Sequence, residues 1–134
     1  MEAAAGLTSH TRHFAAASES IGAARDLVRD AVAGTQLDHA TVTDLQLAVS
    51  ELVTNAVVHG NGASIAVEVT VAPDVITCAV ASDGQTLPEV SSWVAPVDGR
   101  SSGRGLSIVR ALADAVTVDV DDDRVVVRCT FERR

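Results

Sequence analysis

The chain has 134 residues, 47% hydrophobic and 21% charged, so it is long enough to bury one core and is expected to form a single domain over residues 1–134. Ten basic residues, all arginine, stand against 18 acidic ones, and the formal net charge of -8 argues against nucleic acid as a partner. No apolar run approaches the roughly 18–20 residues of a membrane span, and Glu2 stands where a signal peptide carries positive charge. We therefore expect a cytoplasmic protein without a membrane segment.

The two cysteines, Cys78 and Cys129, do not form a C-x-x-C pattern, and each lies within an alternation of apolar residues. We interpret both as core residues, since neither a disulfide framework nor a zinc site is indicated. Aromatic residues make up only 2% of the chain, so the core must consist mainly of Val, Ala, Leu and Ile.

The first part of the chain predicts a strand and a helix. Residues 1–11 have little pattern and are expected to form a loose tail, followed by a short edge strand around residues 12–16. Ser18 is a candidate N-cap for a helix over residues 19–33, which Gly34 would end. The apolar residues of this segment recur at helical spacing: Ile21, Ala24, Leu27, Val28 and Ala31.

A second helix is predicted up to Gly60. Thr41 and Asp44 resemble a capping box at its start, and the Gly60-Asn61-Gly62 segment is a stop signal. Its apolar residues follow one stripe: Leu45, Val49, Leu52, Val53, Ala56 and Val57.

From Ser64 the apolar period changes to two, which predicts a hairpin with one buried face around the Pro73-Asp74 turn. The residues expected on that face are Ile65, Val67, Val69 and Val71, then Ile76, Cys78, Val80 and Ser82. Residues 83–104 read as a long irregular loop, of a kind that is often functional. A short helix over 105–115 and strands over 116–120 and 124–131 complete an α+β fold with helices on one face of a mixed, mainly antiparallel sheet.

Three polar residues of the second helix, Glu51, Asn55 and His59, recur every four residues and so form a row beside the apolar stripe. A carboxylate that accepts a proton, one turn from an amide oxygen that binds a hard cation, suits a phosphate carried by Mg²⁺. Taken alone, the row is more typical of a solvated helix flank, because polar residues at helical spacing are common.

Two glycine-containing segments add to this pattern. In Gly103-Arg104-Gly105-Leu106 the glycines allow close backbone approach, and the helix that follows directs free amides toward an anion. The segment Ser82-Asp83-Gly84 ends a predicted strand. By themselves, these segments are also consistent with a loop end and an ordinary turn.

The order and spacing of these segments are more specific than any one of them. Residues 51–60, the strand end at residues 82–84 and residues 103–114 together resemble the GHKL superfamily of histidine kinase-like ATPases, and most closely its small branch of anti-sigma-factor serine kinases. The likeness covers roughly residues 12–132. It implies a Bergerat-type two-layer α/β sandwich with an ATP pocket between the sheet and the second helix.

The resemblance also implies roles for individual residues. Glu51 would be the general base or water-orienting carboxylate, Asn55 the Mg²⁺ ligand, and the segment after Gly84 a lid over the nucleotide. The backbone of Gly103, Gly105 and Leu106 would hold the phosphates, with Arg104 neutralising charge. His59 would line the far end of the pocket, although a histidine at a helix C-terminus also has a purely structural explanation.

One position departs from the family pattern. Family members end the third strand with an Asp that accepts a hydrogen bond from the adenine amino group. In this sequence, alternation from Cys78 and Val80 places Ser82 at that position. A neutral acceptor contributes about 0.5–1.5 kcal/mol and a charged one about 1.5–3, so the affinity for adenine is expected to fall by roughly tenfold.

The resemblance thus implies an anti-sigma-factor-like regulator that uses ATP and Mg²⁺ to phosphorylate a serine or threonine of an antagonist protein. Its partners would be a sigma factor and that antagonist, and a homodimer is left open. Ser82 favours the alternative, an ATP-independent protein-binding module with a degenerate nucleotide site. A third hypothesis is an ATPase domain cut from a larger protein.

Overall fold

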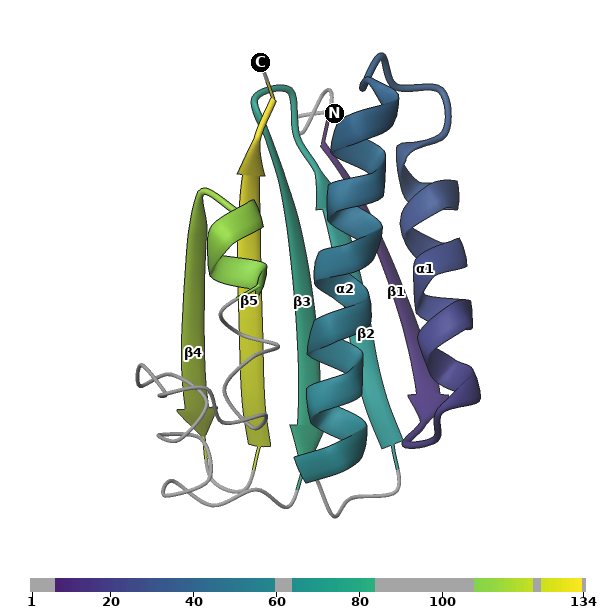
Figure 1. Ribbon diagram of the computed structural model, residues 1–134, viewed down its shortest axis with the longest axis vertical. Helices are drawn as coiled ribbons and strands as arrows, with labels where there is room; N and C mark the ends of the chain where they lie inside the picture. The colour runs from purple at the N-terminus through teal and green to yellow at the C-terminus, as the bar shows by residue number, and fades with distance from the viewer. Residues whose placement is uncertain (1–6, 60–63, 84–107, 122–123, 134) are drawn as a thin grey trace.

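The computed structural model describes residues 7–59, 64–83, 108–121 and 124–133, which form two layers (Figure 1). One layer is a five-stranded sheet, and the helices lie together on one of its faces, as the sequence predicts. In chain order the elements are β1 (Thr8–Ala15), α1 (Glu19–Val32), α2 (His39–His59), β2 (Ser64–Val71), β3 (Val75–Asp83), β4 (Ala115–Asp121) and β5 (Arg124–Glu132).

The strands are arranged in the order β1-β2-β3-β5-β4, and each neighbouring pair is antiparallel. The sequence predicts a mixed sheet, but the described strands contain no parallel pair. The reason is the order of the last two strands. The chain places β4 at the outer edge, and β5 then folds back between β4 and β3.

Alternate residues of β2, β3 and β5 build the core on the helix-covered face, and on β3 the intervening Ala79 and Ala81 are buried as well. The hairpin prediction is confirmed, because every second residue is buried against α1 and α2. The buried positions are Ile65, Val67, Val69, Val71, Ile76, Cys78, Val80, Ser82, Val125, Val127, Cys129 and Phe131.

Cys78 and Cys129 lie opposite each other on β3 and β5, and both are fully buried. The prediction that they are core residues is confirmed, and both are free thiols. Hydrogen bonding between the two thiols, which favours the protonated form of Cys78, and burial together raise the pKa of Cys78 well above its usual value.

Helix α1 ends at Val32, one residue before the predicted end, and Gly34 just beyond it has a φ of 84°, which suits glycine. Ser18 is the N-cap residue of α1, as predicted, but the expected capping hydrogen bond of its side chain is not formed. Ser18 has helical φ and ψ angles of -61° and -31°, whereas a capping side chain needs an extended backbone. Instead, the Ser20 hydroxyl donates to the Ala15 carbonyl at 2.6 Å, which links the start of α1 to the end of β1.

Helix α2 begins earlier than the predicted capping box of Thr41 and Asp44. An Asp38 carboxylate oxygen accepts from the Thr41 backbone N–H at 2.9 Å, which makes Asp38 the cap and places Thr41 inside the first turn. This hydrogen bonding with Thr41 lowers the pKa of Asp38. The buried stripe of α2 is otherwise as predicted: Leu45, Ala48, Val49, Leu52, Val53 and Ala56.

Two further boundaries differ from the prediction. Because β1 begins at Thr8, the residues from there to 11 belong to the sheet rather than to a loose tail. The predicted helix over 105–115 is helical at residues 108–112 and ends there, since β4 begins at Ala115. Among the described helices, none is long and apolar enough to cross a membrane.

Candidate functional site

The predicted site residues that the structure describes come from α2 and β3. Helix α2 packs across β3, and its last turns lie at the same end of the molecule as the end of β3 (Figure 1). Asn55, in the last turns of α2, and Ser82, next to the last residue of β3, therefore lie toward that end of the fold, and Glu51 lies one turn before Asn55.

Asn55 is the most informative of these residues. Its side chain is 8% exposed, and its amide nitrogen Nδ2 is buried without a hydrogen-bond partner among the described residues. Leaving a buried donor unpaired costs about 1–3 kcal/mol, so natural proteins rarely retain one without a reason. A ligand atom that accepts a hydrogen bond from this nitrogen would remove the cost.

Glu51 lies one helical turn before Asn55 and is half-buried. It makes no hydrogen bond or ion pair with another residue in the described part of the chain. The carboxylate and the amide thus lie on the same flank of α2, and no described residue holds Glu51 in a structural contact. His59 lies in the last turn of α2, and its side chain is outside the described residues.

Ser82 lies on the helix-facing side of β3, as the alternation predicts. It is 5% exposed, and its register partners are Ile65 on β2 and Val125 on β5. A neutral hydroxyl therefore occupies the buried position at the end of β3, where the family pattern has a carboxylate. The hydroxyl group can both donate and accept a hydrogen bond.

The remaining predicted site residues, Gly84, Gly103, Arg104, Gly105 and Leu106, lie outside the described residues. The described chain resumes at residues 108–112, a short helical segment whose Val109 is fully buried in the core. Val109 therefore packs into the core shortly after Leu106, the last residue of the glycine-containing segment.

The residues present fit a Mg²⁺ ion that arrives with a nucleotide. Among the described residues, no group of three or more His, Cys, Asp or Glu side chains could hold a metal ion. Mg²⁺ is commonly bound by one or two protein oxygens together with substrate phosphates, and does not need a cage made of protein alone. The side-chain amide of Asn55 also carries an oxygen, and the Glu51 carboxylate contacts no other described residue, so the two residues offer hard oxygen ligands of that kind.

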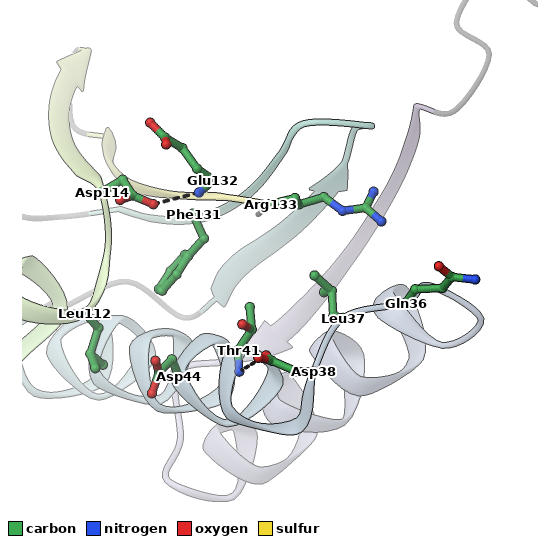
Figure 2. Close-up of a pocket in the computed structure, with 10 residues that line it drawn as sticks. All are labelled: Gln36, Leu37, Asp38, Thr41, Asp44, Leu112, Asp114, Phe131, Glu132 and Arg133. Atoms are coloured by element: carbon green, nitrogen blue, oxygen red, sulfur yellow. Dashed lines mark hydrogen bonds between the residues drawn. The ribbon is translucent and has the colours of Figure 1, made fainter.

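The opposite end of α2 carries a pocket of about 370 Å³ (Figure 2). It lies roughly 20 Å from Asn55 along the helix axis, given a rise of about 1.5 Å per residue. Its lining comes from the start of α2, the segment after the 108–112 helix and the end of β5: Gln36, Leu37, Asp38, Thr41, Asp44, Leu112, Asp114, Phe131, Glu132 and Arg133.

Structural hydrogen bonds already occupy most polar groups in this pocket (Figure 2). Asp38 accepts from Thr41, and Asp114 accepts from the Glu132 backbone N–H at 2.7 Å. The Arg133 guanidinium donates to the Ala72 carbonyl at 2.7 Å. Although this pocket has volume, these polar groups are occupied in holding the start of α2 and the end of β5.

The sequence indicates Asn55 as a candidate ligand. It does not reveal that the buried amide nitrogen of Asn55 lacks a hydrogen-bond partner among the described residues. No sequence signal could supply it, because burial of Asn55 depends on how α2 rests on the sheet. The pocket at the start of α2 was also missed, for the same reason. The Asp38 cap had a local signal, since Asp-x-x-Thr places a carboxylate three residues before a helical N–H.

Comparisons with known proteins identify the fold and the family pattern. The profile of the family described as the histidine kinase-like ATPase domain matches residues 14–131. A search of curated proteins finds no match to this sequence.

Two solved structures share the fold. One is the crystal structure of the RsbU and RsbW domains of Rv1364c from Mycobacterium tuberculosis, with a TM-score of 0.72 and 22% identity over 92% of this chain. This chain spans 31% of the length of that one. The other is the SiaB-SiaC complex from Pseudomonas aeruginosa, with a TM-score of 0.65, 14% identity, and coverage of 92% of this chain and 89% of that chain.

Proposed function

Because the chain belongs to the histidine kinase-like ATPase family, we propose that it is an ATP-binding regulator that phosphorylates a serine or threonine of an antagonist protein. The proposal includes a sigma factor as the second binding partner and a homodimer as the working state. Similarity in fold to a structure with RsbU and RsbW domains and to SiaB in complex with SiaC supports a regulatory protein-binding role.

The observation that carries the nucleotide site is the buried amide of Asn55. It lacks a partner within the described chain and lies on the helix that the family pattern places against ATP. A structural asparagine at this burial would be expected to pair with backbone or side-chain groups. Asn55 is therefore better explained as a ligand-binding residue than as part of a solvated helix flank.

Each residue then has a chemical role in phosphoryl transfer. Asn55 would hold Mg²⁺, which when bound neutralises charge on the nucleotide phosphates. Glu51 would accept the proton of the substrate's serine or threonine hydroxyl while the hydroxyl oxygen bonds to the γ-phosphorus. ADP would leave with the electrons of the broken P–O bond. Ser82 would hydrogen-bond the purine edge, while Gly103, Arg104 and Gly105 would bind the phosphates.

A second function, an ATP-independent protein-binding module, is favoured by one observation. Ser82 places a neutral group where the family pattern has an adenine-binding carboxylate. The loss of a charged hydrogen bond weakens nucleotide binding without disturbing the fold.

Calorimetric titration of the protein with ATP, with and without Mg²⁺, separates the two functions. The kinase proposal expects saturable binding that requires Mg²⁺, with a Kd below about 1 mM. Absence of binding at millimolar ATP would leave the protein-binding module. Binding that is independent of Mg²⁺ would contradict the role given to Asn55.

A further inference from the structure

The two cysteines of the chain meet near the centre of the sheet, on the neighbouring strands β3 and β5. Cys78 and Cys129 are directly opposite each other in the register, although roughly 50 residues separate them along the chain. Both are fully buried free thiols, and they are hydrogen-bonded to each other. The proposed function gives neither thiol a role.

The sheet register provides the spacing that a disulfide needs. Directly opposite residues of an antiparallel pair have Cα atoms about 4.5 or about 5.5 Å apart, depending on whether the pair is hydrogen-bonded through its backbone. Disulfides join residues whose Cα atoms are about 4.4–6.8 Å apart. Because Cys78 and Cys129 also lie on the same face of the sheet, either spacing allows the two sulfur atoms to bond without a shift of the strands.

Apolar surroundings protect the pair in the closed fold. In the row that crosses the sheet, Val69 on β2 flanks Cys78, and Val116 on β4 flanks Cys129. Helix α2 packs on both β3 and β5, so it covers this face (Figure 1). Hydrogen bonding and burial raise the pKa of Cys78, whereas attack on an oxidant requires a thiolate. The thiols are therefore expected to react when a local opening admits water and oxidant.

From this geometry we propose that Cys78 and Cys129 are a redox modification site, which a small disulfide such as oxidised glutathione converts to a protein disulfide. In the opened state one thiol loses its proton to water, and its thiolate attacks a sulfur of the small disulfide, whose other sulfur leaves as a thiolate. The second cysteine, also deprotonated, attacks the sulfur of the first and expels the remaining small thiolate. The protein loses two hydrogens, and the small disulfide is reduced to two thiols.

The bond would make the stability of the fold depend on the redox state. It closes a ring of roughly 50 residues, which includes Gly103, Arg104 and Gly105. A ring of this size restricts the unfolded chain and usually favours the folded state by roughly 30- to 1,000-fold. We therefore expect the oxidised protein to melt roughly 5–15 °C above the reduced one. Where thiols are kept reduced, as in the cytosol, such bonds are usually transient and sense redox change.

Equilibration with mixtures of reduced and oxidised glutathione tests the site. The protein is equilibrated once folded and once in denaturant, free thiols are alkylated, and the oxidised fraction is counted by mass. Each equilibrium is approached from the reduced and from the oxidised protein, so that slow access to buried thiols is not mistaken for a weak bond. The folded protein should retain the disulfide in mixtures at least about 30-fold more reducing than those that the unfolded chain withstands.

An exchange of two neighbouring core residues is the matched control. Val127 lies opposite Val80, so V127C/C129V moves one thiol to a position diagonal to Cys78 without changing the composition of the core. Diagonal positions have Cα atoms about 7–8 Å apart, which is too far for a disulfide in the folded protein. Folding should therefore oppose the bond in this variant, and oxidation should lower its melting temperature.

Three results would overturn the proposal. The folded original protein could form the disulfide no more readily than its unfolded chain, its oxidised form could melt below the reduced form, or the exchanged variant could favour the bond as strongly. The first two comparisons use the original sequence alone, so they decide the matter even if V127C/C129V does not fold. The test contains no nucleotide and no partner protein, so its outcome is independent of the proposed function.

Discussion

The two ends of helix α2 use polar side chains in opposite ways. At its start, Asp38 caps the helix and Asp114 holds the end of β5, so these two carboxylates are occupied by backbone N–H groups. Toward its end, the buried amide of Asn55 has no partner among the described residues, and Glu51 is free of structural contacts with them. The pocket of about 370 Å³ lies at the start of α2, whereas the buried amide nitrogen without a described partner lies toward its end.

This difference shows why volume alone is a poor guide to a binding site. A pocket whose polar groups already have partners offers little to a ligand, because binding must first break those hydrogen bonds. A buried polar group without a partner is destabilising until a ligand arrives, so it adds to the affinity when the ligand binds.

Substitution of Asn55 tests this contrast with the largest expected effect. Asn55→Ala should weaken Mg²⁺-dependent ATP binding by at least about 100-fold, the loss expected when a metal ligand is removed. The melting temperature should change little, because the amide nitrogen makes no hydrogen bond that the variant would lose. Calorimetry and thermal unfolding measure the two effects separately.

The neighbouring Thr54→Ala is a matched control, since it truncates a polar side chain whose hydroxyl does have a partner, the Ser50 carbonyl at 2.7 Å. It should leave ATP affinity unchanged. A large loss of stability in Asn55→Ala with nucleotide binding intact would show that Asn55 is structural and would remove the contrast between the two ends.

Ser82→Asp should tighten ATP binding on the order of tenfold, because a charged acceptor replaces a neutral one. GTP should gain less, since its purine presents a carbonyl where adenine presents an amino group. Competition titrations with the two nucleotides measure the difference. An unchanged ATP affinity would mean that Ser82 does not face the base.

At the other end of the helix, Asp38→Ala should lower the melting temperature by a few degrees and leave ATP affinity unaltered. The folded-state pKa of Asp38 is lowered by hydrogen bonding with Thr41, so its stabilising effect is present above the unfolded pKa of about 4 and is lost as the pH falls through the folded value. The difference in melting temperature between the two proteins should therefore be full at neutral pH and shrink below about pH 4. A difference in melting temperature that persists well below about pH 4 would contradict the role of Asp38 as the N-cap.

Asp44→Asn should have the smallest effect. Asp44 lines the pocket at the start of α2 and makes no hydrogen bond or ion pair with another described residue. We expect ATP affinity to stay within about twofold and the free energy of unfolding within about 0.5 kcal/mol, which titration and denaturant unfolding would measure. If this variant lost ATP binding as Asn55→Ala should, the nucleotide site would lie at the wrong end of the helix.

Much of the fold could be predicted because its signals are local. The period-two runs of β2, β3 and β5 specify which residues are buried whatever lies against them, since a shift of one residue would expose the whole apolar set. The stop at Gly34 is equally local, because it needs only a positive φ. The caps were less predictable: Ser18 and Thr41 are both good capping residues, and backbone angles at one and the competing Asp38 at the other prevented the expected capping hydrogen bonds.

The sequence by itself determined the spacing of Glu51, Asn55 and Ser82 along the chain, the alternation that buries Ser82, and the family to which the pattern belongs. Only the tertiary structure decided that the amide of Asn55 is buried without a described partner, and that Cys78 and Cys129 lie opposite each other on β3 and β5. The physical reason is the range of the interactions. Alternation and helix periodicity depend on neighbours along the chain, whereas burial and cross-strand pairing depend on strands that the fold brings together from distant positions.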